Sequence, residues 1–158
     1  MEHPKVIGDR TALAVIAGLN AAGYRILVPF GENIRYDLAI DEETRLARVQ
    51  CKTGRLIDGA VKFRACSSYA HHPNPQVRFR PYHGEIDYFG VYCPDTTGVY
   101  LIPIEDLPNR TSVALRVDPA RNNQRLGIRL AEWYEIAKVS VTPTAGLRAT
   151  SGAAAPSA

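Results

Sequence analysis

Two runs of alternating apolar residues flank a polar tetrapeptide, and this pattern constrains the fold more than any other feature of the sequence. Residues 34–41 and 46–52 alternate as half-buried strands do, and Glu-Glu-Thr-Arg lies between them. The pattern predicts a β-hairpin. If the loop is residues 42–45, Asp41 lies opposite Leu46, and the same register places Asp37 opposite Gln50.

The other segments predict a mixed α/β architecture. Residues 9–22 are apolar almost all round and predict a buried helix, with Asp9 as its N-cap and Gly23 just beyond its end. Residues 24–30 are predicted as an inner strand, and residues 69–85 as an irregular excursion. A second helix is expected over 126–137, where Trp133 would pack on the sheet. Further strands are expected at 59–65, 86–94, 99–104 and 112–117. The expected fold is a mixed sheet with a central antiparallel meander, flanked by helices.

The length of 158 residues favours a single core, with residues 1–141 as the domain. Residues 142–158 are rich in Ala, Ser, Thr, Pro and Gly and predict a disordered tail. Three cysteines without a CxxC pair point to a reducing cytoplasm. The apolar stretch at 12–19 is far shorter than the ~20 residues that cross a bilayer. Glu2 and Asp9 disfavour a secretory leader there.

Polar side chains of the predicted hairpin share one sheet face. Because strand side chains alternate, Gln50 and Lys52 point the same way, while Cys51 points to the other side. Asp37 lies opposite Gln50 and diagonal to Lys52, so the three polar tips are expected to converge. An acid and an amide oxygen can hold a hard divalent cation, and an adjacent ammonium suits phosphodiester hydrolysis. From the spacing alone, a solvated Asp/Lys pair on a hairpin face is the more common explanation.

Six ordered blocks of sequence carry a resemblance to a known family. The blocks are residues 23–24, 29–32, 35–38, 49–54, 84–89 and 100–103, within a match from about Ile7 to Ala137. The chain resembles the PD-(D/E)XK endonuclease family that includes group I intron-encoded homing endonucleases. The resemblance implies a restriction-endonuclease-like fold, Mg²⁺-dependent (or Mn²⁺-dependent) hydrolysis of double-stranded DNA, and a homo-oligomer, dimeric or tetrameric.

The resemblance also assigns roles within the motif. Asp37 matches the metal-binding aspartate and Lys52 the catalytic lysine, while Gln50 occupies the position that holds Asp or Glu in the wider superfamily. The expected catalytic residues are therefore Asp37, Gln50 and Lys52. Family members often carry a glutamate on the first helix, but this chain has no Glu between residues 3 and 31. Asp9 is the expected metal ligand there, beside Asp37, Gln50 and the Cys51 carbonyl; Glu32 and Asp87 are alternatives.

Basic residues cluster on both sides of the motif. Between residues 45 and 64 six basic residues accompany one acid, and between 110 and 129 five arginines accompany one acid. Such clusters suit the phosphate backbone of DNA. Arg78 and Arg80 lie in the excursion, whose aromatic and basic residues could enter a groove or stack on bases. The predicted DNA contacts are Arg35, Arg48, Arg55, Lys62, Arg64, Arg78 and Arg80.

Three functions remain open at this point. The first is a metal-dependent endonuclease acting on double-stranded DNA, of the homing type. The second is a DNA-binding or regulatory protein that keeps the fold but cuts poorly, which the neutral Gln50 and the missing helix glutamate would favour. The third is a junction-resolving or repair nuclease with the same chemistry.

Overall fold

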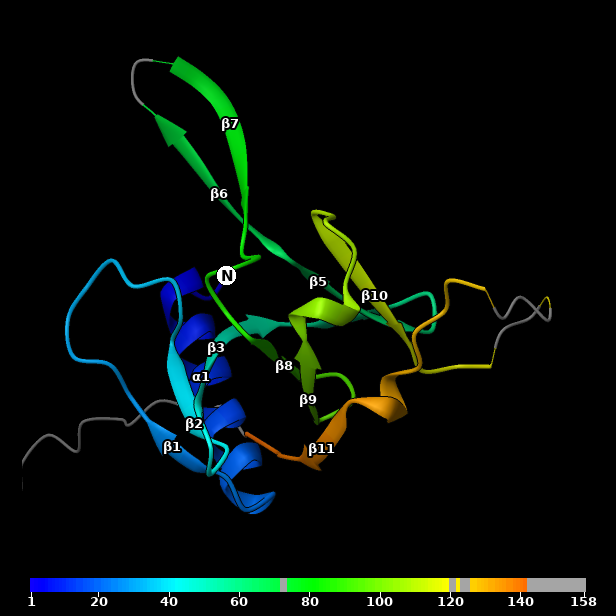
Figure 1. Ribbon diagram of the computed structural model, residues 1–158. Helices are drawn as coiled ribbons and strands as arrows, with labels where there is room; N and C mark the ends of the chain where they lie inside the picture. Colours follow the sequence, from blue (N-terminus) through cyan, green and yellow to red (C-terminus); the bar gives the residue numbers. More distant parts are fainter. Residues whose placement is uncertain (72–73, 120–121, 123–125, 142–158) are drawn as a thin grey trace, which may run out of the picture.

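The computed structural model describes residues 1–71, 74–119, 122 and 126–141, with 68–71 and 74–78 described by their backbone alone. At its centre lies a curled six-stranded sheet in the order β1-β2-β3-β8-β9-β11 (Figure 1). Its strands are β1 (Arg25–Leu27), β2 (Leu38–Asp41), β3 (Leu46–Thr53), β8 (Tyr88–Cys93), β9 (Gly98–Pro103) and β11 (Glu135–Lys138). The predicted mixed α/β class is confirmed. Strands β3 and β8 pair in parallel, so two antiparallel units meet at one parallel pair instead of forming one continuous meander.

Helix α1 (Pro4–Ala21) begins five residues before the predicted start. His3 is the N-cap and Pro4 occupies the first turn, where its missing N–H costs no hydrogen bond. Asp9 therefore lies inside the helix with an exposed side chain, and its predicted role as N-cap is wrong. The predicted end is confirmed, because Gly23 has a φ of +92° and donates to Asn20 O at 3.0 Å.

The helix packs on one face of the central sheet. Ala14, Val15 and Leu19 are buried there against apolar residues of β2, β3, β8 and β9. Glycines allow this close approach: a Cβ on Gly90 of β8 would lie 2.7 Å from a methyl group of Val15. The outward side of the helix is exposed, with Leu13 at 64%. The predicted burial of the helix therefore holds for one side only.

A small three-stranded sheet covers the other face. It consists of β10 (Ser112–Arg116), β5 (Ala60–Arg64) and β4 (Arg55–Ile57), in that order. The chain leaves β3 and enters β4 at Gly54, where a Cβ would meet Val61 at 2.7 Å and Val91 at 3.0 Å. Aromatic and aliphatic side chains fill the space between the two sheets, and Phe63 and Phe89 pack edge to face with ring centroids 5.5 Å apart.

The segment predicted as an irregular excursion forms a two-stranded antiparallel ribbon. Strands β6 (Cys66–His71) and β7 (Asn74–Pro81) pair along their length and extend away from the body (Figure 1). We call this ribbon the arm. Prolines and histidines mask its strand pattern in the sequence, while backbone pairing between the two strands holds it extended.

The last predicted helix, over 126–137, is also wrong. Residues 131–133 form a single 3₁₀ turn, η2 (Ala131–Trp133), and β11 then adds an edge strand to β9. Pairing overrides helical spacing here: Leu101 N–H donates to Tyr134 O at 2.9 Å, and Arg116 N–H donates to Arg129 O at 2.7 Å. Trp133 is 62% exposed instead of packing on the sheet. Residues 24–30 were expected as an inner strand, but β1 is a short edge strand.

The cysteines, the tail and one short helix complete the description of the chain. Cys51, Cys66 and Cys93 are all free thiols. Within the described residues, no helix has both the length and the apolar character needed to cross a membrane. The predicted disordered tail at 142–158 lies outside the described residues. A short 3₁₀ helix, η1 (Ile104–Asp106), follows β9.

The packing of α1 on β8 predicts opposite effects for two glycine substitutions. Gly90→Ala should lower the free energy of unfolding by about 1–3 kcal/mol, because the new methyl group overlaps Val15 and Val49. Gly8→Ala, with no atom near its Cβ on the exposed side of α1, should raise it by about 0.5–1 kcal/mol. Urea denaturation measures both. A stabilising Gly90→Ala would contradict the helix–sheet contact described here.

Candidate active site

The predicted register of β2 and β3 is confirmed. Leu38 pairs with Val49 and Asp41 with Leu46, and Asp37 N–H donates to Val49 O at 2.9 Å just before β2 begins. Asp37 therefore stands opposite Gln50, on the sheet face turned away from α1.

The Asp37 carboxylate is held by two donors from β3. The side-chain amide of Gln50 donates through Nε2 to Asp37 Oδ2 at 2.7 Å, and Cys51 N–H donates to the same oxygen at 2.8 Å. The Asp37 side chain also reaches solvent, so the site is open to a substrate. The sequence places these groups together because Asp37 precedes β2 by one residue and β3 presents Gln50 directly across from it.

Opposing effects act on the charge of Asp37. Partial desolvation raises the pKa of Asp37 above its usual value, while the Cys51 N–H group and the nearby charge of Lys52 act to lower it. Desolvation is the largest of these effects, so the pKa of Asp37 is raised overall. The donors of the chain therefore offset the loss of solvent incompletely, and an additional positive charge at this carboxylate would be favourable.

The oxygen atoms near Asp37 suit a hard cation. Gln50 Nε2 also donates to Cys51 O at 3.3 Å, so the amide nitrogen lies between two oxygens. Rotation of the amide by half a turn would exchange its nitrogen for its oxygen and bring three oxygens together. Oxygens of this type are the ligands that Mg²⁺ prefers. The Cys51 thiol takes no part, because it packs against the core under α1 and burial raises its pKa.

Lys52 lies on the same face of β3 as Gln50. Its ammonium donates to the Tyr82 hydroxyl at 3.2 Å and lies 4.8 Å from the centroid of the Tyr82 ring. Sequence reasoning placed Tyr82 in a loop that could stack on bases. The structure shows it 4% exposed in the core beneath the site. The sequence carried no clear signal for this contact, because Tyr82 lies 30 residues after Lys52 in the chain, between the arm and a turn.

The other predicted ligands lie in different surroundings. Asp9 is on the exposed side of α1, and this helix packs on the sheet face opposite to Gln50 and Lys52. Glu32 is exposed in the loop before β2. Asp87 accepts from Arg48 N–H at 2.7 Å and pairs with the Arg48 side chain at 3.3 Å. In the described part of the chain, no three His, Cys, Asp or Glu side chains gather closely enough to hold a metal ion. A metal role for Asp9 stays a prediction.

The predicted DNA contacts divide into two groups. Arg35 and Arg80 both pair with Glu85, and Arg48 pairs with Asp87, so these three arginines are engaged within the protein. The second group lies on the outer face of the small sheet. There Arg55 is opposite Lys62, and the Arg64 guanidinium lies 5.6 Å from the Phe79 ring centroid. Arg78 lies in β7, where only its backbone is described.

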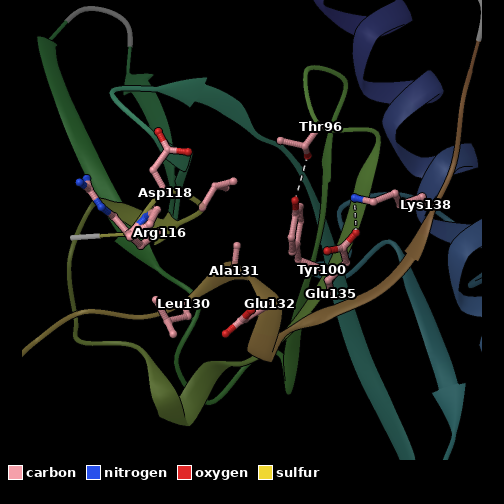
Figure 2. Close-up of a pocket in the computed structure, with 11 residues that line it drawn as sticks. Thr96, Tyr100, Arg116, Asp118, Leu130, Ala131, Glu132, Glu135 and Lys138 are labelled. Carbon is pink, nitrogen blue, oxygen red and sulfur yellow. Dashed lines mark hydrogen bonds and ion pairs between the residues drawn. The ribbon is translucent and has the colours of Figure 1, made fainter. Parts of the chain in front are cut away.

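A cavity of about 350 Å³ lies apart from this site, between β9, β10, η2 and β11 (Figure 2). Tyr100 is hydrogen-bonded to Thr96, and Glu135 pairs with Lys138 at 2.5 Å. Figure 2 marks both contacts with dashed lines. Asp37, Gln50 and Lys52 do not line it. Its lining mixes acids and bases, so its charge gives no preference for a phosphate.

An acid, an amide and a lysine therefore share one face of a mixed sheet, a donor set that is compatible with a metal-dependent nuclease. The sequence profile of the PD-(D/E)XK endonuclease family matches residues 2–137, and the chain belongs to this family. The resemblance noted from the sequence is thereby confirmed. Asp37, Gln50 and Lys52 all fall within the matched residues.

The fold has a counterpart among solved structures. A bacterial homing endonuclease, I-Ssp6803I, matches with a TM-score of 0.66 and 22% sequence identity, over 85% of this chain and 89% of that chain. At this identity the likeness concerns the fold alone. No curated protein matches the sequence.

Proposed function

We propose that this protein is a divalent-metal-dependent endonuclease that hydrolyses phosphodiester bonds of double-stranded DNA. One observation carries the proposal: the Asp37 carboxylate, the Gln50 amide and the Cys51 carbonyl converge within hydrogen-bond distance, with Lys52 on the same strand face. Membership of the PD-(D/E)XK endonuclease family supports it.

The residues divide the chemistry between them. Asp37, the Gln50 side-chain oxygen and the Cys51 carbonyl would hold Mg²⁺ or Mn²⁺, which when bound activates water and polarises phosphate oxygens. Lys52 orients the attacking water or neutralises charge that develops on the phosphate. Its ammonium is available for this because its hydrogen bond goes to a neutral hydroxyl rather than to a carboxylate. Gln50 adds no charge, so Asp37 supplies the single negative charge of this ligand set.

Charge on the outer face of the small sheet supports a duplex-binding role. Arg55 and Lys62 face each other across two strands, an arrangement that costs stability unless an anion lies nearby. Asp58 offsets Lys62 in part, at 3.7 Å. A hollow of about 190 Å³ beside them is also lined by Arg116 and Arg129. Phosphate groups of a duplex would offset these charges.

The arm supports recognition of a groove. A two-stranded ribbon fits the major groove of B-DNA, and the arm extends from the body as such a ribbon. We extend the proposal to a homing-type enzyme with a long target, because the similar structure is that of a homing endonuclease. Cleavage of a randomised DNA library tests this extension. Cut ends that share a long sequence would support it, and cut ends without any shared sequence would contradict it.

Nicking of plasmid DNA tests the main proposal. Wild-type protein with Mg²⁺ should nick the plasmid, and Asp37→Ala and Lys52→Ala should each reduce nicking at least about 100-fold by removing a metal ligand or an electrostatic stabiliser. Asp41→Ala and Lys138→Ala are matched controls away from the site and should retain activity. Wild-type protein that binds duplex but gives no metal-dependent nicking would instead support a DNA-binding module.

Gln50→Glu tests the amide as a ligand. We expect it to bind Mg²⁺ at least as tightly as wild type, because a second carboxylate adds charge to the ligand set. Isothermal titration calorimetry measures the affinity, and Asn109→Asp is a control that adds the same charge on an exposed loop. A sharply increased Mg²⁺ requirement in Gln50→Glu alone would count against Gln50 as a ligand.

The salt dependence of DNA binding tests the basic face. The logarithm of the affinity should fall steeply with the logarithm of the salt concentration, and Arg55→Ala combined with Lys62→Ala should lower the slope by about 2. Lys5→Ala combined with Arg25→Ala removes the same charge from the α1 and β1 side and should leave the slope unchanged. An equal decrease in both double variants would remove the argument for a specific surface.

An oligomer that cuts both strands is part of the proposal. The chain between β1 and β2 bulges from the body and exposes large apolar side chains, with Phe30 at 104% and Val28 at 68%. Contact with a second copy would cover them. Light scattering should give a multiple of the 17.4 kDa chain mass that falls in Phe30→Asp. A monomer at micromolar concentration would contradict this part.

A further inference from the structure

Tyr82 connects two parts of the molecule. It directly follows β7, the second strand of the arm, and its side chain is 4% exposed. Its ring packs edge-on against Phe89, with centroids 5.5 Å apart and planes at 88°. Since Phe89 belongs to the central sheet, the ring is fixed to the same sheet that carries the candidate site.

The polar end of Tyr82 meets Lys52. The hydroxyl accepts a hydrogen bond from the ammonium at 3.2 Å, and the ammonium is 4.8 Å from the ring centroid. A cation within about 6 Å of an aromatic ring is attracted to it. Both interactions act on a lysine whose four-carbon side chain otherwise samples many rotamers. Tyr82 therefore restricts where the ammonium can lie.

Arg35 fixes the ring to the root of the arm. Its guanidinium carbon lies 3.9 Å from the Tyr82 ring centroid. The same group donates to Ser67 Oγ on β6 at 2.7 Å and to Pro81 O at the end of β7 at 2.9 Å. It also pairs with Glu85 beyond Tyr82. Because Arg35 is two residues before Asp37, these contacts join both strands of the arm to the segment that carries the acid.

We propose that Tyr82 is a positioning residue that holds the Lys52 ammonium in place on the sheet face that carries Asp37 and Gln50, and that Arg35 links this position to the arm. The inference rests on the proposed function. The orientation of the arm and the position of Lys52 are then coupled through one aromatic ring. The reaction depends on this placement, since a misplacement of about 1 Å can cost 100-fold in rate.

Single-turnover cleavage of DNA by a saturating excess of protein, with saturating Mg²⁺, tests the role of the ring. Tyr82→Phe keeps the ring but loses the hydroxyl, so its rate should fall about 10-fold; Tyr82→Leu loses both, and its rate should fall about 100-fold. Affinity for DNA should change less than twofold in both. Tyr134→Phe is the matched control, since it removes a hydroxyl that donates to Asp106 instead, at 3.1 Å. Unchanged rates in both Tyr82 variants would overturn the inference.

Arg35 acts through the same ring, which gives a second kinetic test. Arg35→Met should lower the rate, and its combination with Tyr82→Leu should lower it no further than Tyr82→Leu alone. If the rate losses of the two single variants multiply in full in the double variant, Arg35 works independently of Tyr82. That result would overturn the proposed link between the arm and the position of Lys52.

An NMR measurement without DNA or metal separates this inference from the proposed function. The Lys52 methylene protons nearest the ammonium should show nuclear Overhauser contacts to the aromatic protons at position 82 in wild type and Tyr82→Phe, and no such contacts in Tyr82→Leu. The same spectra report whether each variant is folded. Absence of these contacts in folded wild type would overturn the positioning contact. Their presence in a wild-type protein that never cuts DNA would overturn the proposed function and, with it, the catalytic purpose of the contact.

Discussion

The register between β2 and β3 is the constraint on which the candidate site depends. Asp37 N–H bonds to Val49 O, which fixes the Asp37 side chain on the face that carries Gln50 and Lys52. A slip of one residue would turn Asp37 toward α1 and bring Leu38 and Ile40 out of the core. Leu38 and Ile40 are at most 1% exposed. The burial of these two residues therefore enforces the geometry of the acid, so the site is positioned by packing on the opposite face of the same strand.

Both faces of the central sheet are covered, and the candidate site lies where the cover of one face ends. Helix α1 buries one face, and the small sheet buries part of the other after the chain turns at Gly54. A Cβ at Gly54 would overlap Val61, so this turn requires the small residue. Lys52 lies two residues before the turn, where the packed core beneath the small sheet meets the open surface around Asp37. Its ammonium can therefore contact a buried ring while its strand face also carries the solvent-exposed Asp37 carboxylate.

The sequence predicted local pairing well and long-range pairing poorly. Alternation and a short polar loop were enough for the β2–β3 hairpin, including the register that places Asp37 opposite Gln50. The parallel pairing of β3 with β8 joins segments almost 40 residues apart, and alternation carries no information about it. Residues 126–137 have helical spacing, yet only a 3₁₀ turn forms at 131–133, and pairing with β9 holds Glu135–Lys138 extended. Tyr82 was misplaced for the same reason, because its partner Lys52 is set by the tertiary fold.

A glutamine opposite Asp37 changes the electrostatics of the site in a specific way. Its amide donates a hydrogen bond to the aspartate at 2.7 Å, so the pair is attractive in the protein alone. A carboxylate at the same position would place two like charges within hydrogen-bond distance and raise the pKa of one of them. Gln50 therefore stabilises the folded chain before any cation binds. Under the proposed function, the same neutrality would leave more of the attraction for a metal ion to the phosphate oxygens of DNA, so binding of metal and binding of DNA would reinforce each other.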